Sequence, residues 1–182
     1  MYRTGGREVL KGSKGKAMKG EQEKFLHDLL PAVLRLRDRT GLPASVVLAQ
    51  AILESGWGRS RLARRNRNLF GIKAHRRTAA VVYTTTEYRG GKRRREKARF
   101  AHYDSYDACL ADYAQLLARP RYAPAREVAH DPFAFARALR RCGYATDPRY
   151  AQKLALLIRR YDLTQYDAAR GRADIPSQPD IT

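Results

Sequence analysis

The stretch A-I-L-E-S-G-W-G at residues 51–58 places one carboxylate, Glu54, at the C-terminal end of an otherwise apolar segment. In the ten residues before it, the only polar side chains are Ser45 and Gln50. A helix that is apolar on every side is buried in the interior of a protein. We therefore expect a buried helix over residues 43–55 that ends directly after the carboxylate.

The position of Glu54 affects its ionisation. Apolar neighbours and the negative end of the helix dipole both disfavour a carboxylate, so both are expected to raise its pKa. A carboxylic acid that stays protonated near neutral pH is what a general acid needs in order to protonate a leaving oxygen. The alternative is an ion pair with Arg59 or Arg61, which follow the helix, and the local sequence leaves both interpretations open.

The size and charge of the chain limit its class. Its 182 residues, 43% of them hydrophobic, suit one domain with a real core. The 37 Lys and Arg against 18 Asp and Glu give a formal net charge of +19, which indicates a polyanionic partner. Nucleic acid, an anionic membrane surface and bacterial wall polymers all fit that charge. The sequence shows no apolar run of about 18 residues that would span a membrane, and no Sec-type signal.

Hydrophobic spacing predicts a mainly α domain with one small β-hairpin lobe. Helices are expected at residues 21–39, 43–55, 59–66, 105–118, 132–141 and 148–160. β-Branched and aromatic residues at 79–88 and 98–103, with glycines between them, predict the two strands. We place the catalytic domain at residues 21–163, between a basic flexible tail at 1–20 and a flexible tail at 164–182.

Basic residues concentrate between residues 59 and 99, which hold 15 Lys and Arg against two acids. The run K-R-R-R at 92–95 is expected at the tip of the hairpin. A cationic rim around a cleft would attract an anionic polymer, and salt would weaken that attraction. The rival interpretation is a DNA-binding helix-turn-helix, in which 43–54 and 59–67 form the two helices and Glu54 has no role.

The cysteines and histidines show no metal-ligand spacing. Cys109 and Cys142 form no C-x-x-C pair, and the four histidines lie apart from the cysteines and from each other. We therefore expect neither a structural zinc ion nor a bound cofactor. A disulfide between Cys109 and Cys142 and two inert buried thiols both remain open.

Six short motifs follow one another along the chain. They are A-x-A-I-L-E-S-G-W-G-R-S (49–60), N-L-F-G-I-K-A (68–74), T-T-E-Y-R-G-G (85–91), F-A-H-Y-D-S (100–105), D-Y (112–113) and G-Y-A-T-D-P-x-Y-A (143–151). Together they resemble the glucosaminidase domain of glycoside hydrolase family 73, which includes the C-terminal half of the flagellar peptidoglycan hydrolase and several autolysins. The resemblance covers about residues 22–163.

This resemblance implies a lysozyme-like α fold with a β-hairpin lobe flanking a substrate groove. It also implies an endo-β-N-acetylglucosaminidase that cleaves the β-1,4 bond after N-acetylglucosamine in peptidoglycan glycan strands, here as a monomeric catalytic unit. By the same resemblance Glu54 is the general acid, and Glu87 and Tyr144 are further catalytic residues. A glycosidase needs one acid on the leaving oxygen and a negative group near the developing oxocarbenium ion or the attacking water. Without the resemblance, Glu87 would be an exposed strand residue and Tyr144 a core tyrosine.

Four further residues are predicted to bind the substrate. The rings of Trp57, Phe70 and Tyr88 could stack on the apolar face of a pyranose, and Asn68 could hydrogen-bond an N-acetyl group. Two of these residues have structural alternatives. Trp57 also suits core packing beneath the turn that follows Glu54, and Asn68 could cap its own loop.

The predicted setting is an antibacterial effector injected by a type VI secretion system, with a phage-type endolysin of the same chemistry as the alternative. A housekeeping autolysin fits less well, because neither a Sec signal nor wall-binding repeats are visible in the sequence. The protein is then expected to be made in the cytoplasm and to act in the periplasm or cell wall of a target bacterium. A cognate periplasmic immunity protein is expected as a partner, and nucleic acid is not.

Overall fold

Helix α2 (Ala44–Ser55) lies at the centre of the molecule. Four other elements pack against it: α1 (Gly20–Thr40), α6 (Pro132–Arg141), α7 (Tyr150–Arg160) and the 3-10 helix η2 (Leu163–Tyr166). All but two of its residues are buried. The buried helix predicted from the apolar sequence is therefore confirmed, and its central position explains why so few of its side chains are polar.

The computed structural model describes residues 20–75, 79–89 and 92–168, and of residues 85–89 and 92–95 it describes the backbone alone. Within these ranges the chain is mainly helical, with one two-stranded antiparallel sheet, so the predicted fold class is confirmed. The remaining helices are α3 (Arg61–Asn66), α4 (Tyr106–Ala118), the 3-10 helix η1 (Pro120–Tyr122) and α5 (Ala123–Arg126). The sequence did not predict η1 and α5, because each is about one turn long and contains a proline.

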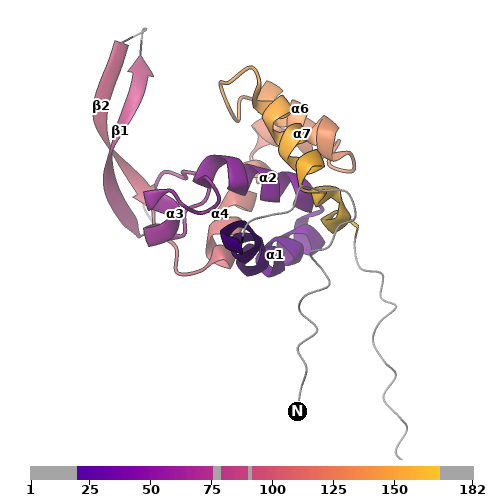
Figure 1. Cartoon of the computed structure of the whole chain (residues 1–182). Helices are drawn as coiled ribbons and strands as arrows, with labels where there is room; N and C mark the ends of the chain where they lie inside the picture. The colour runs from indigo at the N-terminus through magenta and orange to yellow at the C-terminus, as the bar shows by residue number, and fades with distance from the viewer. Residues whose placement is uncertain (1–19, 76–78, 90–91, 169–182) are drawn as a thin grey trace, which may run out of the picture.

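Strands β1 (Ala80–Arg89) and β2 (Lys92–Ala101) form the predicted hairpin, which projects from the helical body (Figure 1). Their antiparallel register places Glu87 opposite Arg94. The basic run at 92–95 lies next to the turn, at the tip end of the hairpin as the sequence suggested, but it belongs to strand β2 and not to a loop. Backbone pairing has extended the strand into residues of low intrinsic β propensity. The two glycines between the strands lie outside the described residues.

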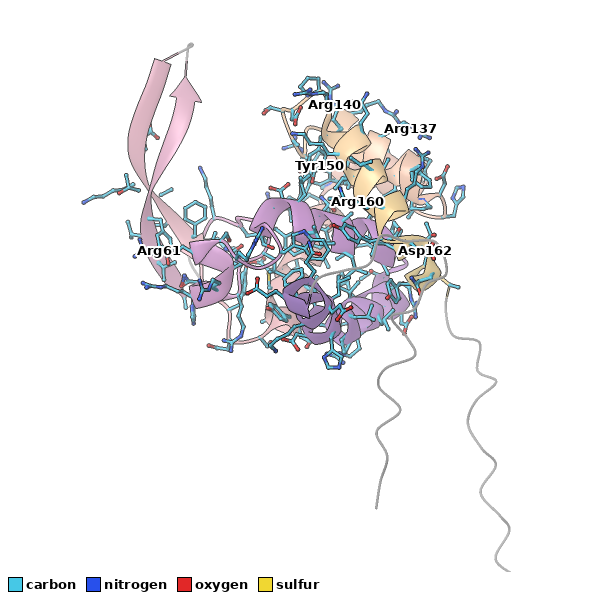
Figure 2. All side chains as sticks on the ribbon, viewed as in Figure 1. Arg61, Arg137, Arg140, Tyr150, Arg160 and Asp162 are labelled. Atoms are coloured by element: carbon cyan, nitrogen blue, oxygen red, sulfur yellow. The ribbon has the colours of Figure 1, made fainter. Side chains whose placement is uncertain are left out.

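Helix α3 packs at the base of the hairpin. Its buried Asn66 donates a hydrogen bond from the side-chain amide to the Tyr83 hydroxyl of β1 (2.9 Å). Arg61 covers the same ring, with its guanidinium carbon 4.9 Å from the ring centroid, and Figure 2 shows it beside the hairpin. The buried face of α3 is committed to the body and the hairpin, whereas Arg64 and Arg65 are exposed. At six residues the helix is short for a recognition helix, so the fold gives the helix-turn-helix interpretation little support.

Residues 164–168, which the sequence assigned to the C-terminal tail, pack on the domain. Tyr166 is buried, and Asp167 accepts a hydrogen bond from the backbone N–H of Ser45 (2.8 Å) in the first turn of α2. The folded domain therefore extends beyond the predicted boundary. The rest of that tail and the predicted N-terminal tail, up to residue 19, lie outside the described residues.

Candidate active site

A groove of about 910 Å³ lies at the C-terminal end of α2. The loop that precedes the hairpin forms one side of it, and the α6–α7 loop with the start of α7 forms the other. Figure 1 shows the hairpin and the α6–α7 pair on opposite sides of α2. The lining of the groove includes Glu54, Phe70, Tyr144, Asp147, Tyr150 and Lys153. The groove therefore brings together three of the predicted site residues: Glu54, Phe70 and Tyr144.

Two turn contacts fix the backbone around Glu54. Gly56 adopts a left-handed conformation, and its N–H donates to the carbonyl of Ile52. The Ser55 hydroxyl accepts a hydrogen bond from the N–H of Gly58 (2.7 Å), which holds the following turn against the helix end. The helix therefore stops immediately behind the residue whose side chain lines the groove.

The protein packed around Glu54 raises its pKa by desolvation, although by surface area the residue is exposed at the groove, so the shift is smaller than that of a fully buried acid. The surrounding protein removes part of the water that would stabilise a carboxylate. Two residues of α7 act in the opposite direction, because Tyr150 offers a hydrogen bond to the carboxylate and Lys153 attracts its charge. The predicted direction of the pKa is confirmed. The alternative ion pair between Glu54 and Arg59 or Arg61 is not formed among the described residues. The Arg59 side chain donates to the carbonyl of Gly56, and the Arg61 side chain covers the Tyr83 ring of the hairpin.

Tyr144 and Phe70 lie in the same groove as Glu54. The Tyr144 ring stacks on Tyr150, with 5.8 Å between the ring centroids, and burial raises the pKa of its hydroxyl well above the ordinary value. That hydroxyl therefore remains a hydrogen-bond donor at neutral pH. Phe70 stacks on Tyr113 at 4.3 Å and is only 9% exposed, so it offers a narrow part of its surface to the groove.

Trp57 and Asn68 lie outside the lining of this groove. Trp57 packs edge-on against Phe25 and Tyr161, with ring centroids 6.2 and 4.8 Å away, and so supports the turn from the core side. The side-chain amide of the buried Asn68 donates to two backbone carbonyls near its own loop, at 2.8 and 3.0 Å. Both residues take the structural role that the sequence had left open. The side chain of Asn68 is fully buried, whereas Trp57 is only partly buried, so its contact with a sugar stays a prediction.

The hairpin residues Glu87 and Tyr88 are described by their backbone alone. Both belong to β1, and Glu87 is paired with Arg94 across the hairpin. Their side chains lie outside the described part of the structure. The catalytic role of Glu87 and the sugar contact of Tyr88 therefore stay predictions.

The family model named glucosaminidase, with the description mannosyl-glycoprotein endo-beta-N-acetylglucosaminidase, matches residues 30–163. The chain belongs to the glucosaminidase family. It is 39% identical over 166 residues to the peptidoglycan hydrolase FlgJ of Pseudomonas aeruginosa, and 38% identical over 153 residues to the exo-glucosaminidase LytG of Bacillus subtilis. These matches cover 87% and 81% of this chain but 42% and 54% of the relatives. The chain thus spans about half the length of these curated relatives.

Solved structures share the fold of this glucosaminidase chain. The catalytic domain of the autolysin Auto from Listeria monocytogenes superimposes with a TM-score of 0.74 at 36% identity. The match covers 83% of this chain and 90% of that domain. The family that the six sequence motifs predicted is therefore confirmed.

Among the residues that line the groove of this glucosaminidase domain and were not predicted from the sequence are Tyr150, Lys153 and Asp147. The Lys153 ammonium lies 2.5 Å from a carboxylate oxygen of Asp147, and this contact holds the pKa of Asp147 below its usual range. The other oxygen accepts from the N–H of Arg149 (2.9 Å), so the aspartate forms a turn directly before α7. Tyr150 and Lys153 share one helix face by their spacing, but only tertiary packing turns that face toward Glu54.

Among residues 20–75, 79–89 and 92–168, no helix combines the length and the apolar character needed to cross a membrane. No group of three or more His, Cys, Asp and Glu residues there is arranged to hold a metal ion. Cys109 is buried, Cys142 is partly buried, and both are free thiols.

Proposed function

We propose that this glucosaminidase domain hydrolyses peptidoglycan at the β-1,4 bond after N-acetylglucosamine, with Glu54 as the general acid. The observation that carries the proposal is a single carboxylic acid at a helix end, with a raised pKa, lining a groove large enough for a glycan. Further support comes from FlgJ, whose name describes a peptidoglycan hydrolase, and from LytG, whose name describes a glucosaminidase.

The reaction needs one proton from Glu54. Its carboxylic acid gives that proton to the bridging oxygen as the bond from the anomeric carbon to that oxygen breaks, and the saccharide beyond it leaves as an alcohol. Water then adds to the anomeric carbon and gives one proton to a base or to solvent, and Glu54 takes a proton from solvent, which restores the acid for the next cycle. Burial favours the neutral acid before the step. We assign to the hydroxyl of Tyr144, which stays protonated and belongs to a residue that lines the groove, a hydrogen bond to the acetamido group or to that water.

A negative group must also stabilise the developing positive charge or activate the water. We assign this role to Glu87 on β1. Asp147 also lines the groove, but one of its oxygens is held by Lys153 and the other by the N–H of Arg149. An aspartate held in this way suits a structural role at the start of α7.

The Glu87 assignment is tested by Glu87→Gln. It should lower turnover strongly, while Glu96→Gln, the same change on the neighbouring strand, should lower it much less. Both rates are measured as soluble product released from sacculi. Full activity in Glu87→Gln would make Glu87 an ordinary surface residue.

Mass spectrometry of borohydride-reduced digests of purified sacculi tests the bond that is cleaved. A glucosaminidase leaves new reducing ends on N-acetylglucosamine, and reducing ends on N-acetylmuramic acid would contradict the proposal. The sizes of early products separate two modes of attack. Internal cleavage, which the sequence predicts, releases long fragments first, whereas an exo-acting enzyme releases only small terminal units.

The antibacterial setting stays a prediction. As an injected effector, the protein would act on the wall from the periplasm, and a cognate immunity protein would close the groove near Glu54. Expression with a periplasmic leader should then lyse cells, whereas cytoplasmic expression of the same chain should be tolerated. Equal harm from both forms would contradict this setting without affecting the proposed chemistry.

A further inference from the structure

A chain of buried hydrogen bonds leads through the interior toward Glu54. The Tyr113 hydroxyl of α4 donates to Gln50 Oε1 (2.5 Å), and Gln50 Nε2 donates to the Tyr150 hydroxyl oxygen (2.8 Å). Gln50 and Tyr113 are each 0% exposed, so water does not compete for these contacts. Gln50 and Glu54 are four residues apart on α2 and lie on one helix face. The hydroxyl that Gln50 holds, on the Tyr150 labelled in Figure 2, therefore lies beside the carboxyl group.

Each link in this chain has a direction. The amide oxygen of Gln50 can only accept a hydrogen bond, and its amide nitrogen can only donate one. Because the Tyr150 oxygen accepts from that nitrogen, its single hydrogen is left for another acceptor. We take Glu54 as that acceptor, because both side chains line the groove and the Tyr150 hydroxyl acts against burial by lowering the pKa of Glu54.

We propose that Tyr113 and Gln50 are positioning residues that act on Glu54 through Tyr150, by holding its hydroxyl as a hydrogen-bond donor to the carboxyl group. The inference rests on the proposed function, because it assumes that Glu54 is the acid. The consequence is chemical as well as geometric. When Glu54 gives up its proton it becomes a carboxylate, and a donor already in place stabilises that product at the moment it forms.

Glu54 is the group near this hydrogen-bond chain whose ionisation the chain is expected to control. Burial raises the pKa of all three tyrosines around it, Tyr113, Tyr144 and Tyr150, so they stay neutral in the range where the enzyme works. The cation of Lys153 faces Glu54 from α7. Three more charged side chains line the groove: Lys73, Arg119 and Asp147. The substitutions described below leave all of these charges unchanged, so a moved titration reports on the hydrogen-bond chain.

Two measurements test the proposal on the full-length protein. One is the pH profile of kcat/KM on soluble peptidoglycan fragments, and the other is direct NMR titration of the Glu54 carboxyl carbon, which needs no activity. In Tyr150→Phe the carboxylate loses its donor, so its pKa should rise and the alkaline fall of the profile should move to higher pH. Gln50→Met and Tyr113→Phe should shift the pKa of Glu54 and the alkaline fall of the profile in the same direction. The value of kcat should fall by up to roughly 100-fold as the acid loses its orientation.

Tyr103→Phe is the matched control. The hydroxyl of this buried tyrosine donates to Asp112 (2.6 Å) outside the groove, so its loss should cost stability without moving either titration. An unmoved or lowered Glu54 pKa in Tyr150→Phe would overturn the proposal. A shift in Tyr150→Phe alone, with Gln50→Met and Tyr113→Phe unchanged, would overturn the part assigned to those two residues. Should Gln50→Met not fold, Tyr113→Phe still tests the far end of the chain. The wild-type protein could cleave no glycan while the variants still show the titration shifts. That result would refute the proposed function but support the hydrogen-bond chain.

Discussion

Gly58→Ala is expected to destabilise the protein more than Gly56→Ala, although both glycines lie in the same turn and have similar backbone angles. Gly58 has a φ of +72°, and an added Cβ would lie 2.6 Å from a ring carbon of Phe25. That ring is buried, only 7% exposed, and packs against Trp57, so it has little room to move. Gly56 has a φ of +59°, and an added Cβ there meets nothing within 4 Å.

The two costs can be separated. A left-handed backbone costs a non-glycine residue roughly 1–2 kcal/mol, and this applies to both variants. Forcing an extra carbon into a packed core costs about 1–3 kcal/mol more, and this applies to Gly58→Ala alone. The free energy of unfolding should therefore fall by about 1–2 kcal/mol in Gly56→Ala and by about 2–5 kcal/mol in Gly58→Ala.

Urea denaturation followed by circular dichroism, with both variants analysed beside the parent chain, measures these differences. The order of stability should be parent, then Gly56→Ala, then Gly58→Ala. Equal losses in the two variants would refute the contact with Phe25. A larger loss in Gly56→Ala would refute the packing of the whole turn after Glu54.

Two further predictions concern Asp167, which contacts the start of α2, and Lys153 on α7, which faces Glu54. Asp167→Ala removes the acceptor at the start of α2 and should lower the free energy of unfolding by about 1 kcal/mol, whereas Asp167→Asn, which keeps an acceptor without a partly buried charge, should lower it less. Urea titration checks the order, and a harmless Asp167→Ala would contradict the capping role. Lys153→Met removes a cation that lowers the pKa of Glu54, so the acid should keep its proton to higher pH. The alkaline fall of kcat/KM should then move upward, and a downward move would contradict the assigned electrostatics.

The central helix and its carboxylate could be predicted because the necessary information is local. A segment that is apolar on every face has to be buried, and a lone Glu54 at its end then has to lie at the edge of the core. The hairpin was predicted from its β-branched residues and glycines. The extent of β2 was not, because backbone pairing with β1 overrides the weak local preference of the basic run at 92–95.

The rest of the site depends on contacts between distant parts of the chain. Tyr150 and Lys153 reach Glu54 only because α7 packs on α2, and a single sequence does not show which helix faces pack together. The same limit applies to Trp57 and Phe70. Either aromatic ring could have faced a glycan, and only the packing of Trp57 on the core and the position of Phe70 in the groove distinguish them.

The rate of sacculus hydrolysis by Glu54→Gln, compared with Glu127→Gln, tests the central claim most directly. Both variants replace one glutamate by its neutral isostere, and Glu127 is exposed and outside the groove lining. The account predicts a loss of about 10²–10⁴-fold in Glu54→Gln and a near-parental rate in the control, with the far-UV spectrum of both unchanged. Normal hydrolysis by a folded Glu54→Gln protein would show that the acid lies elsewhere.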